Sequence, residues 1–389
     1  MPQLAAALDP AAVRTLLARH APGLINDSDA SAVRAVRVVR YKAERRCLIE
    51  YHLAPGGGQR PVCLLAKVQA KRIKADRFDC LRALYLAGFD QQSPHGVSIP
   101  EPLAVIPELH MWLQRRVSGS VATHFLLLPG GERIAARIAE AIHRVHRAGV
   151  PAPKTNAEND SGSRIRKSGS RIRKNSGSTA NGPNSHEFGY GQNSASSLQK
   201  NRAPRCPKTH RPADELAILQ QRLPAVAQSH PRLRKRIARL LEACTQLAGE
   251  LPVAASCGIH RDFYPDQVLV DGQRLYLVDF DLYCRGDPAL DAGNFAGHLI
   301  ELGLRRFGDP NRLRPVERAF VERFLALSPD TAPAAVDIYT TLTLARHVSL
   351  STQFHSRRHL TERLLGICEQ RLRRPPAEAV TNTTGERGP

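Results

Sequence analysis

Short apolar runs separated by charged or glycine-rich positions dominate the first part of the chain. These runs cover residues 36–41, 47–53, 62–68, 97–108 and 111–117. Their length and their content of valine, isoleucine and leucine are typical of β-strands. Residues 54–58 contain a proline and a run of glycines, which ends the second strand. Between the third and fourth runs, residues 72–86 indicate a helix that ends at Gly88.

The apolar period changes to that of a helix after about residue 116. Apolar residues then recur every three or four positions in several stretches, which predicts amphipathic helices that pack on a common core. These stretches begin at Ile134, Leu216, Val316 and Leu360. One exception is Asp271-Gly272, which separates the short apolar runs 267–270 and 274–278 and predicts a β-hairpin. The pattern as a whole predicts an α+β fold.

Residues 156–206 follow neither pattern, because they are rich in serine, asparagine, glycine and basic residues. The sequence of 161–167 is repeated immediately at 168–174. Such a composition buries too little apolar surface to offset the entropy lost on ordering. We therefore predict a disordered insertion at 156–206 and a disordered tail at 376–389.

Candidate chemistry lies around the predicted hairpin. Asp262 precedes it in the sequence His260-Arg261-Asp262, and Asp279 follows its second strand. Phosphoryl transfer needs a carboxylate that orients the attacking hydroxyl, together with oxygen ligands for Mg²⁺. Asp262 has the residue type for the first role. Gln267 and Asp279 have the residue types for the second, and the hairpin would bring them together at its open end.

Four segments together resemble the catalytic core of the aminoglycoside phosphotransferase and choline kinase group of the protein-kinase-like superfamily. They are His260-Arg261-Asp262, Gln267, Asp279-Phe280-Asp281 and Gly286-Asp287-Pro288. The resemblance implies a bilobal fold, with a small β-rich nucleotide-binding lobe at 1–115 and a larger helical lobe for catalysis and acceptor binding at 116–375. The group usually has asparagine at the position of Gln267.

The same resemblance implies a lysine on the third strand that contacts the phosphates of ATP. Lys67 occupies that strand, where a lysine is costly unless it has a partner. A lysine that reaches water from an edge strand is the alternative. Kinase-like folds pair this lysine with a glutamate on the following helix, but here only Asp76 and Asp79 are available, and both remain candidates.

These features predict an ATP- and Mg²⁺-dependent phosphotransferase that moves the γ-phosphate to a hydroxyl of a small metabolite, sugar or antibiotic. A nucleotide-binding module with weak or no catalysis is the alternative, because Gln267 and the missing helix glutamate depart from the pattern. A protein kinase is disfavoured, since Asp279-Phe280-Asp281 replaces Asp-Phe-Gly and no Ala-Pro-Glu follows.

The formal net charge of +20 raises the question of nucleic-acid binding. Part of this charge lies in the insertion 156–206, and the rest is dispersed arginine without an RNA-binding motif, so no nucleic-acid partner is predicted. A nucleic-acid tether is the competing reading of the insertion. A strongly cationic acceptor also fits poorly, since its cleft should be acidic.

The chain contains no apolar run of about 18 residues and no secretory signal at its start, so neither a membrane span nor secretion is predicted. Its eight cysteines form no Cys-x-x-Cys pair, and most lie in apolar patterns. This usage suits buried thiols in a reducing compartment. We therefore expect a cytoplasmic protein.

Overall fold

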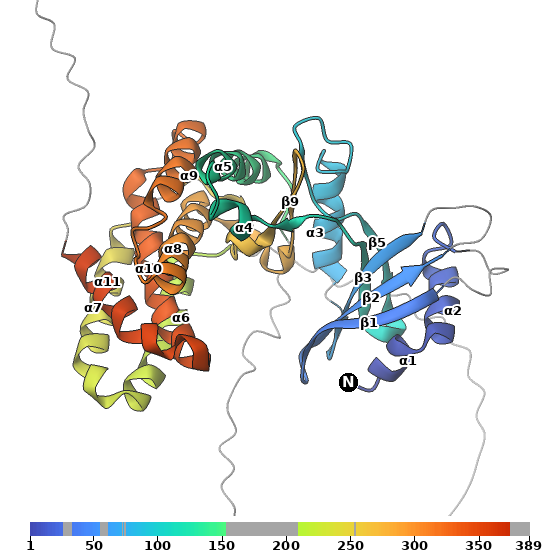
Figure 1. The fold of residues 1–389 in the computed structure, drawn as a ribbon, viewed down its shortest axis with the longest axis horizontal. Helices are drawn as coiled ribbons and strands as arrows, with labels where there is room; N and C mark the ends of the chain where they lie inside the picture. The colour runs from blue at the N-terminus through green and yellow to red at the C-terminus, as the bar shows by residue number, and fades with distance from the viewer. Residues whose placement is uncertain are drawn as a thin grey trace, which may run out of the picture. The chain divides into compact units, whose positions relative to one another are not determined.

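The computed structural model describes residues 1–25, 33–54, 61–71, 73, 75–152, 209–252 and 254–373. The predicted insertion at 156–206 and the tail at 376–389 lie outside these described residues. Within them the chain has a sheet-rich N-terminal region and a helical C-terminal region (Figure 1). The predicted α+β class is therefore confirmed.

An antiparallel five-stranded sheet forms the N-terminal region, in the order β1-β2-β3-β6-β5 (Figure 1). Its strands are β1 (Val33–Lys42), β2 (Arg46–Leu53), β3 (Val62–Gln69), β5 (Pro102–Ile106) and β6 (Met111–Arg115). The runs predicted at 36–41, 47–53, 62–68 and 111–117 correspond to four of them.

One face of this sheet packs against two helices, α1 (Leu4–Leu8) and α2 (Pro10–His20). Asp9 caps α2 by accepting a 3.0 Å hydrogen bond from the Ala11 amide. Tyr51, fully buried on β2, donates a 2.7 Å hydrogen bond to the Ala7 carbonyl. Because side chains alternate along a strand, the opposite face of the sheet carries Lys67, which lies across from Trp112 of β6.

The prediction of one strand over 97–108 is wrong. The structure divides this run into β4 (Val97–Ser98), β5 and a short 3-10 turn at Pro107–Leu109. Pro100 and Pro102 stand between and at the start of the strands, and proline cannot donate to a continuous ladder. β4 consequently leaves the five-stranded sheet and pairs in parallel with β10.

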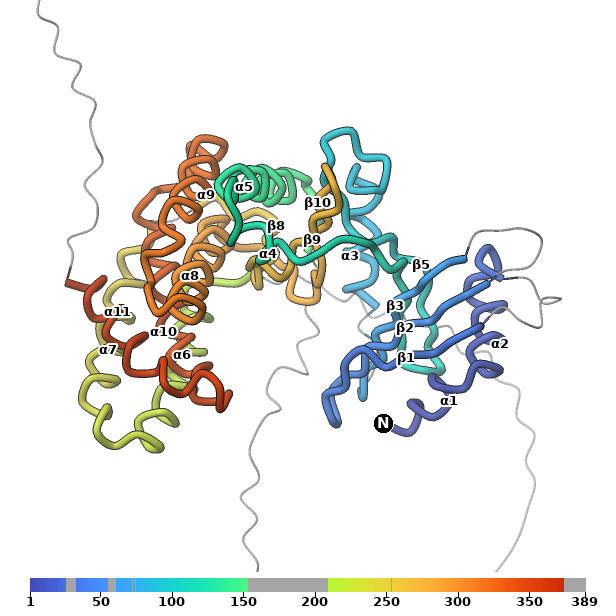
Figure 2. Tube along the Cα trace, in the orientation of Figure 1, coloured from blue at the N-terminus to red at the C-terminus, as the bar shows by residue number. Residues whose placement is uncertain are grey.

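A second, four-stranded sheet has the order β4-β10-β9-β7 and contains the predicted hairpin. The hairpin consists of β9 (Val268–Asp271) and β10 (Arg274–Leu277), and its turn includes Gly272 with a φ of 56°. Strand β7 (Ser120–Val121) pairs with β9. Figure 2 follows the chain from the five-stranded sheet through β7's segment into the helical region. The predicted hairpin is confirmed.

Helices make up most of the C-terminal region (Figures 1 and 2). They are α4 (Ala122–Leu126), α5 (Gly131–Arg147), α6 (Pro212–Ser229), α7 (Arg234–Gly249), α8 (Pro288–Phe307), α9 (Arg314–Leu327), α10 (Pro333–Gln353) and α11 (Thr361–Leu372). All four predicted helical stretches are confirmed.

Helix α8 lies at the centre of the helical core, and most of its side chains are buried. It packs closely on α10 because of its glycines. A Cβ atom built at Gly293 would lie 2.5 Å from the Cβ of Tyr339, and one at Gly297 would lie 2.8 Å from a methyl group of Thr343. The close approach brings polar side chains of α8 and α10 into direct contact.

Helix α3 (Ala75–Leu86) follows the five-stranded sheet in sequence but contributes Cys80, Leu81 and Leu84 to the helical core. The remaining short elements are β8 (Cys257–Ile259), which pairs with β11 (Cys284–Gly286), and 3-10 turns at Pro231–Leu233, Pro265–Gln267, Phe280–Leu282 and His355–Leu360. None of the helices in the described ranges combines the length and apolar character that crossing a bilayer requires.

Candidate active site

The loop that carries Asp262 connects β8 to the 3-10 turn Pro265–Gln267, and α8 holds its backbone in place. The amides of His260 and Arg261 donate to the two oxygens of Asp291, at 2.8 and 2.7 Å. Asn294, one turn further along α8, donates a 2.7 Å hydrogen bond to the Arg261 carbonyl. These bonds fix the residue before Asp262, whose φ of 71° lies in the left-handed region.

Asp291 is fully buried, so its charge requires partners. Besides the two loop amides, its carboxylate lies 2.9 Å from Nε2 of His146 on α5. Three elements thus converge on one buried carboxylate. Asp291 thus holds the backbone of the loop just before Asp262.

His260 connects the same loop to the hairpin. Its ring nitrogen Nε2 lies 2.9 Å from the carbonyl oxygen of Val278, the residue before Asp279. The ring is fully buried and packs against Phe280 at 4.7 Å between centroids. His260 therefore couples the position of the Asp262 loop to that of Asp279.

Asp262 itself is half-buried. Its charge is felt by Tyr264, two residues later. Burial, together with the negative charges of Asp262, Asp266 and Asp279, raises the pKa of the Tyr264 hydroxyl to about 12. The carboxylates of Asp262 and Asp279 therefore act on the same ring.

Gln267 and Asp279 lie at the open end of the hairpin, as the sequence predicted. The Val278 amide donates a 2.9 Å hydrogen bond to the Gln267 carbonyl. Gln267 is 7% exposed. Asp279 has a φ of 65°, in the left-handed region, at the point where the chain leaves the hairpin for the turn Phe280–Leu282.

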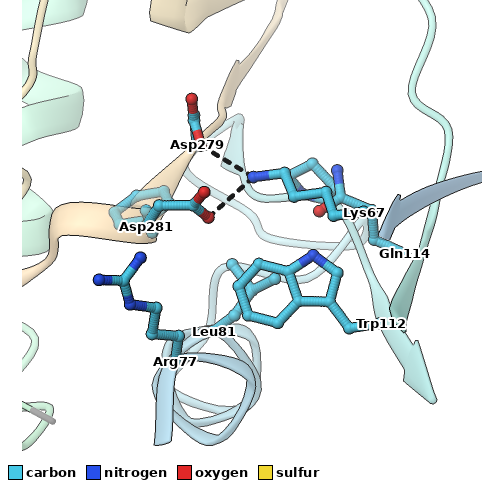
Figure 3. A pocket seen from close by; sticks show the side chains of 9 residues that line it. Lys67, Arg77, Leu81, Trp112, Gln114, Asp279 and Asp281 are labelled. Carbon is cyan, nitrogen blue, oxygen red and sulfur yellow. Dashed lines mark hydrogen bonds and ion pairs between the residues drawn. The ribbon is translucent and has the colours of Figure 1, made fainter. Parts of the chain in front are cut away.

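Lys67 reaches this site from β3 and pairs with two carboxylates (Figure 3). Its Nζ atom lies 2.8 Å from Oδ1 of Asp279 and 2.9 Å from Oδ1 of Asp281. Asp281 also pairs with Arg46 of β2 at 3.2 Å. Within the described residues neither Asp76 nor Asp79 pairs with Lys67, so the second acidic partner comes from the segment after the hairpin.

The ion pairs shift both pKa values. Burial raises the pKa of the Asp279 carboxyl, but the charge of Lys67 and its hydrogen bond outweigh this effect and hold the pKa well below its usual range. Burial likewise lowers the pKa of Lys67, and the charges of Asp281 and Asp279 more than reverse it. Lys67 is therefore a cation and Asp279 an anion at neutral pH.

A pocket lies beside this ion pair, between β3, β6 and α3 (Figure 3). It encloses about 250 Å³ of space not filled by atoms, part of it open to solvent. The indole of Trp112 lines it, with its centroid 5.4 Å from Lys67 Nζ. The buried Nε1 of Trp112 has no hydrogen-bond partner among the described residues, so a donor is available beside Lys67.

All four predicted site residues thus lie on connected segments. Lys67 contacts Asp279 directly, and Gln267 bonds to the residue before Asp279. The loop of Asp262 is joined to the end of the hairpin through His260. An amide oxygen and a carboxylate are suitable ligands for Mg²⁺. A carboxylate beside a hydroxyl can accept its proton.

Sequence reasoning did not assign roles to Asp291, Asn294 and Asp281. A signal existed for the first two. Gly286-Asp287-Pro288 marks the start of a helix, and Asp287 does cap α8 by accepting a 2.9 Å hydrogen bond from the Ala289 amide. Asp291 and Asn294 occupy its first two turns.

The sequence matches the model of the phosphotransferase enzyme family over residues 80–334. This match includes the Asp262 loop, the hairpin and α8, but begins after Lys67. No curated protein matches the chain.

Several solved structures have the same fold. A choline kinase from Cryptosporidium parvum Iowa II has a TM-score of 0.55 at 12% identity, covering 93% of this chain and 95% of its own. A thermostable mutant of the aminoglycoside phosphotransferase APH(4)-Ia, in a ternary complex with AMP-PNP and hygromycin B, has a TM-score of 0.51 at 14% identity, covering 93% and 97%. The amicoumacin kinase hAmiN, in complex with AMP-PNP, Ca²⁺ and Ami, has a TM-score of 0.50 at 12% identity, covering 86% and 88%.

Proposed function

Because this chain belongs to the phosphotransferase enzyme family, we propose that it transfers the γ-phosphate of ATP to a hydroxyl group of a small molecule, with Mg²⁺. In this proposal residues 1–115 bind the nucleotide, and residues 116–375 provide the catalytic groups and bind the acceptor. The enzyme acts in the cytoplasm, where ATP is available and where its free thiols remain reduced. It needs neither a membrane nor a nucleic acid.

The observation that carries the proposal is the ion pair between Lys67 and Asp279. It places a cation from the five-stranded sheet beside an oxygen ligand at the end of the hairpin. Phosphoryl transfer depends mainly on positioning the reactants and on neutralising phosphate charge. A lysine for the phosphates and a carboxylate for the metal are the two groups that this chemistry requires.

In the proposed reaction, Asp262 orients the acceptor hydroxyl and accepts its proton. A bond forms between the acceptor oxygen and the γ-phosphorus, and the bond from that phosphorus to the β–γ bridging oxygen breaks, so that ADP leaves. Lys67 binds the phosphates. Gln267 and Asp279 would hold Mg²⁺, which when bound neutralises charge on the phosphates.

Two of the similar structures support the choice of donor and metal. The APH(4)-Ia complex contains AMP-PNP, and the amicoumacin kinase complex contains AMP-PNP and Ca²⁺. Both are ATP-analogue complexes of small-molecule kinases with this fold. The donor nucleotide proposed here is the same class of molecule.

The test is ADP formation by the full-length protein with a panel of hydroxyl compounds, in the presence and absence of Mg²⁺. Asp262→Asn should lower turnover by about 10²-fold or more, while ATP affinity changes little. Asp266→Asn is a matched control, since Asp266 is an exposed residue of the same loop that accepts a 2.5 Å hydrogen bond from Thr123. Equal turnover in wild type and Asp262→Asn would overturn the role of Asp262.

A second candidate function is nucleotide binding without turnover, favoured by Gln267. Its side chain is one methylene longer than the asparagine expected there, which displaces the amide oxygen. Mg²⁺-dependent ATP binding with no ADP formation against the whole panel would support this function. In that case Gln267→Asn should restore turnover.

A further inference from the structure

Two histidines of the helical region stack beside the Asp262 loop. The ring of Tyr264 lies parallel to that of His298 on α8, with centroids 4.5 Å apart and 16° between planes. His298 in turn meets the edge of His347 on α10, at 4.5 Å and 82°. This column of three rings runs from two residues after Asp262 into the interface of α8 and α10.

Arginines surround the same rings. Arg346 on α10 donates a 3.1 Å hydrogen bond to the side-chain oxygen of Asn294. The side-chain nitrogen of Asn294 bonds in turn to the carbonyl of Arg261, the residue before Asp262. Arg346 is therefore two hydrogen bonds away from the catalytic loop. Arg305 and Arg357, like Arg346, act electrostatically on both histidines.

The carboxylates near these arginines only partly neutralise them. Glu301 lies 2.9 Å from Nε of Arg305 but 3.8 Å from Nη1 of Arg357. Glu215 lies 3.8 Å from Nη1 of Arg346 and is already 2.8 Å from a ring nitrogen of His210. Distances of 3.8 Å are too long for hydrogen bonds. In the part of the chain that the structure describes, these three guanidinium groups share two carboxylates within 4 Å, so donor capacity remains on Arg346 and Arg357.

Burial and the nearby positive charges lower the pKa values of both histidines. Burial, together with the positive charges of Arg346, Arg357 and Arg305, lowers the pKa of the His347 ring to about 3. Burial and the same neighbours, with His347, lower the pKa of His298 well below its usual value. Both rings are therefore neutral at pH 7 and do not add to the positive charge.

His347 also has an unsatisfied polar atom. The residue is 3% exposed, and its Nε2 has no hydrogen-bond partner among the described residues. A buried polar atom without a partner has lost its hydrogen bonds to water and gained none in return, which is unfavourable. An orphaned nitrogen in a cluster with free guanidinium donors is the arrangement that an oxygen-rich ligand would complete.

Resting on the phosphotransferase function proposed above, we infer that the acceptor carries an anionic group, a phosphate or a carboxylate, which Arg346 and Arg357 bind beside the His298–His347 pair. A planar guanidinium presents paired donors that match the oxygens of either group. The anion would hold the acceptor near Tyr264, with its hydroxyl directed to Asp262. A cationic amino alcohol would meet like charge at the same place and be repelled.

Direct binding tests this inference without turnover. Inorganic phosphate and glycerate are titrated calorimetrically into the full-length protein. Arg346→Gln and Arg357→Gln should each weaken binding about 10-fold or more, as expected for one charge-assisted interaction. Arg318→Gln is the matched control, because Arg318 is an exposed arginine of α9 that pairs with Glu322 at 3.7 Å. It should leave binding unchanged.

Lys67→Met separates this site from the nucleotide site, which also attracts anions. Phosphate binding that Lys67→Met abolishes and the two arginine variants leave intact would overturn the inference. Arg346 is largely buried, so a folding defect in Arg346→Gln is recognised by its melting temperature. Arg357 is more exposed, and its variant then decides the outcome.

Turnover with matched acceptors separates this inference from the proposed function. A sugar phosphate, a hydroxy acid, the neutral sugar and an amino alcohol are compared, and one of the two anionic compounds should give the highest kcat/KM. Comparison of the sugar phosphate with the hydroxy acid shows whether a phosphate or a carboxylate is preferred. Preference for the neutral or cationic compound, unaffected by Arg357→Gln, would sink the inference and leave the phosphotransferase function standing. Loss of anion binding in the arginine variants, with no ADP formation from any acceptor, would support the anion site and overturn the phosphotransferase function.

Discussion

Asp281 and Lys67 lie 214 positions apart in the chain, yet their side chains form a 2.9 Å ion pair. Lys67 therefore has an acidic partner that is separate from Asp279. In the proposed reaction Asp279 would bind a metal ion, and Asp281 would then keep the lysine in position. The third residue of Asp279-Phe280-Asp281 thus pairs with Lys67, where the sequence resemblance led us to expect an acidic residue of the following helix.

Removing this second partner should weaken nucleotide use. Asp281→Asn removes the negative charge that pairs with Lys67 at 2.9 Å and with Arg46 at 3.2 Å. We expect kcat/KM for ATP to fall about 10-fold, the value of one charge-assisted interaction. Steady-state kinetics at varied ATP measures it. Asp271→Asn, at an exposed residue of the hairpin turn, is the control; an equal loss there would contradict a specific role for Asp281.

Replacing Asp291 by alanine should lower the free energy of unfolding and the turnover more than replacing it by asparagine. Asp291→Ala leaves the amides of His260 and Arg261 without their acceptor in a buried site. We expect a loss of about 3 kcal/mol in the free energy of unfolding, together with lower turnover. Asp291→Asn keeps one oxygen and should recover part of both. Urea unfolding followed by circular dichroism gives the free energies. If Ala and Asn behaved alike, the hydrogen bonds to the loop would not be the cause.

The close contact of α8 and α10 predicts opposite effects for two glycine substitutions. Gly293→Ala would place its methyl group 2.5 Å from the Cβ of Tyr339, so the helices must separate. We expect a destabilisation of about 1–3 kcal/mol. Gly366→Ala on α11 meets only the end of the Arg236 side chain at 3.9 Å and should stabilise the protein by about 0.5–1 kcal/mol. Melting temperatures that moved in the same direction would contradict this packing.

Glu317 on α9 predicts a pH dependence of stability. Burial raises the pKa of its carboxyl to about 7, from an ordinary value of 4.5. The folded protein thus keeps a proton that the unfolded chain loses, so stability from this group is present below pH 4.5 and decreases as pH rises to 7. Glu317→Gln should therefore gain about 1–2 kcal/mol over wild type at about pH 8 and little at about pH 4.

Thermal unfolding of wild type and Glu317→Gln across this pH range provides the measurement. Glu322→Gln is the control, because Glu322 lies on the same helix with its side chain 69% exposed. The control should follow the wild-type curve. A constant difference between Glu317→Gln and wild type at all pH values would mean that the carboxyl of Glu317 does not titrate in this range.

The sequence predicted those parts of the structure that depend on local signals. Asp271-Gly272 determines a hairpin within a few residues, and Lys67 is conspicuous in an apolar strand. The partner of Lys67 was not predictable in this way, since Asp281 approaches it only through the tertiary fold. Asp76 and Asp79 were candidates because they lie on the helix that follows the strand of Lys67, but Lys67 pairs with Asp279 and Asp281 instead. Likewise, the apolar run 97–108 does not reveal that Val97 and Ser98 pair with a strand far along the chain.

The connections from β4 to β5 and from β6 to β7 limit how the two sheets can move relative to each other. β4 and β7 flank the hairpin in one sheet, so the segments that connect to the five-stranded sheet are hydrogen-bonded to β10 and β9, whose ends adjoin Asp279 and Gln267. At Gly119 a Cβ atom would lie 2.7 Å from the Val270 carbonyl oxygen, so the segment between β6 and β7 packs directly against β9. We therefore expect any movement of Lys67 relative to Asp279 to arise in the residues between β4 and β5 and between β6 and β7.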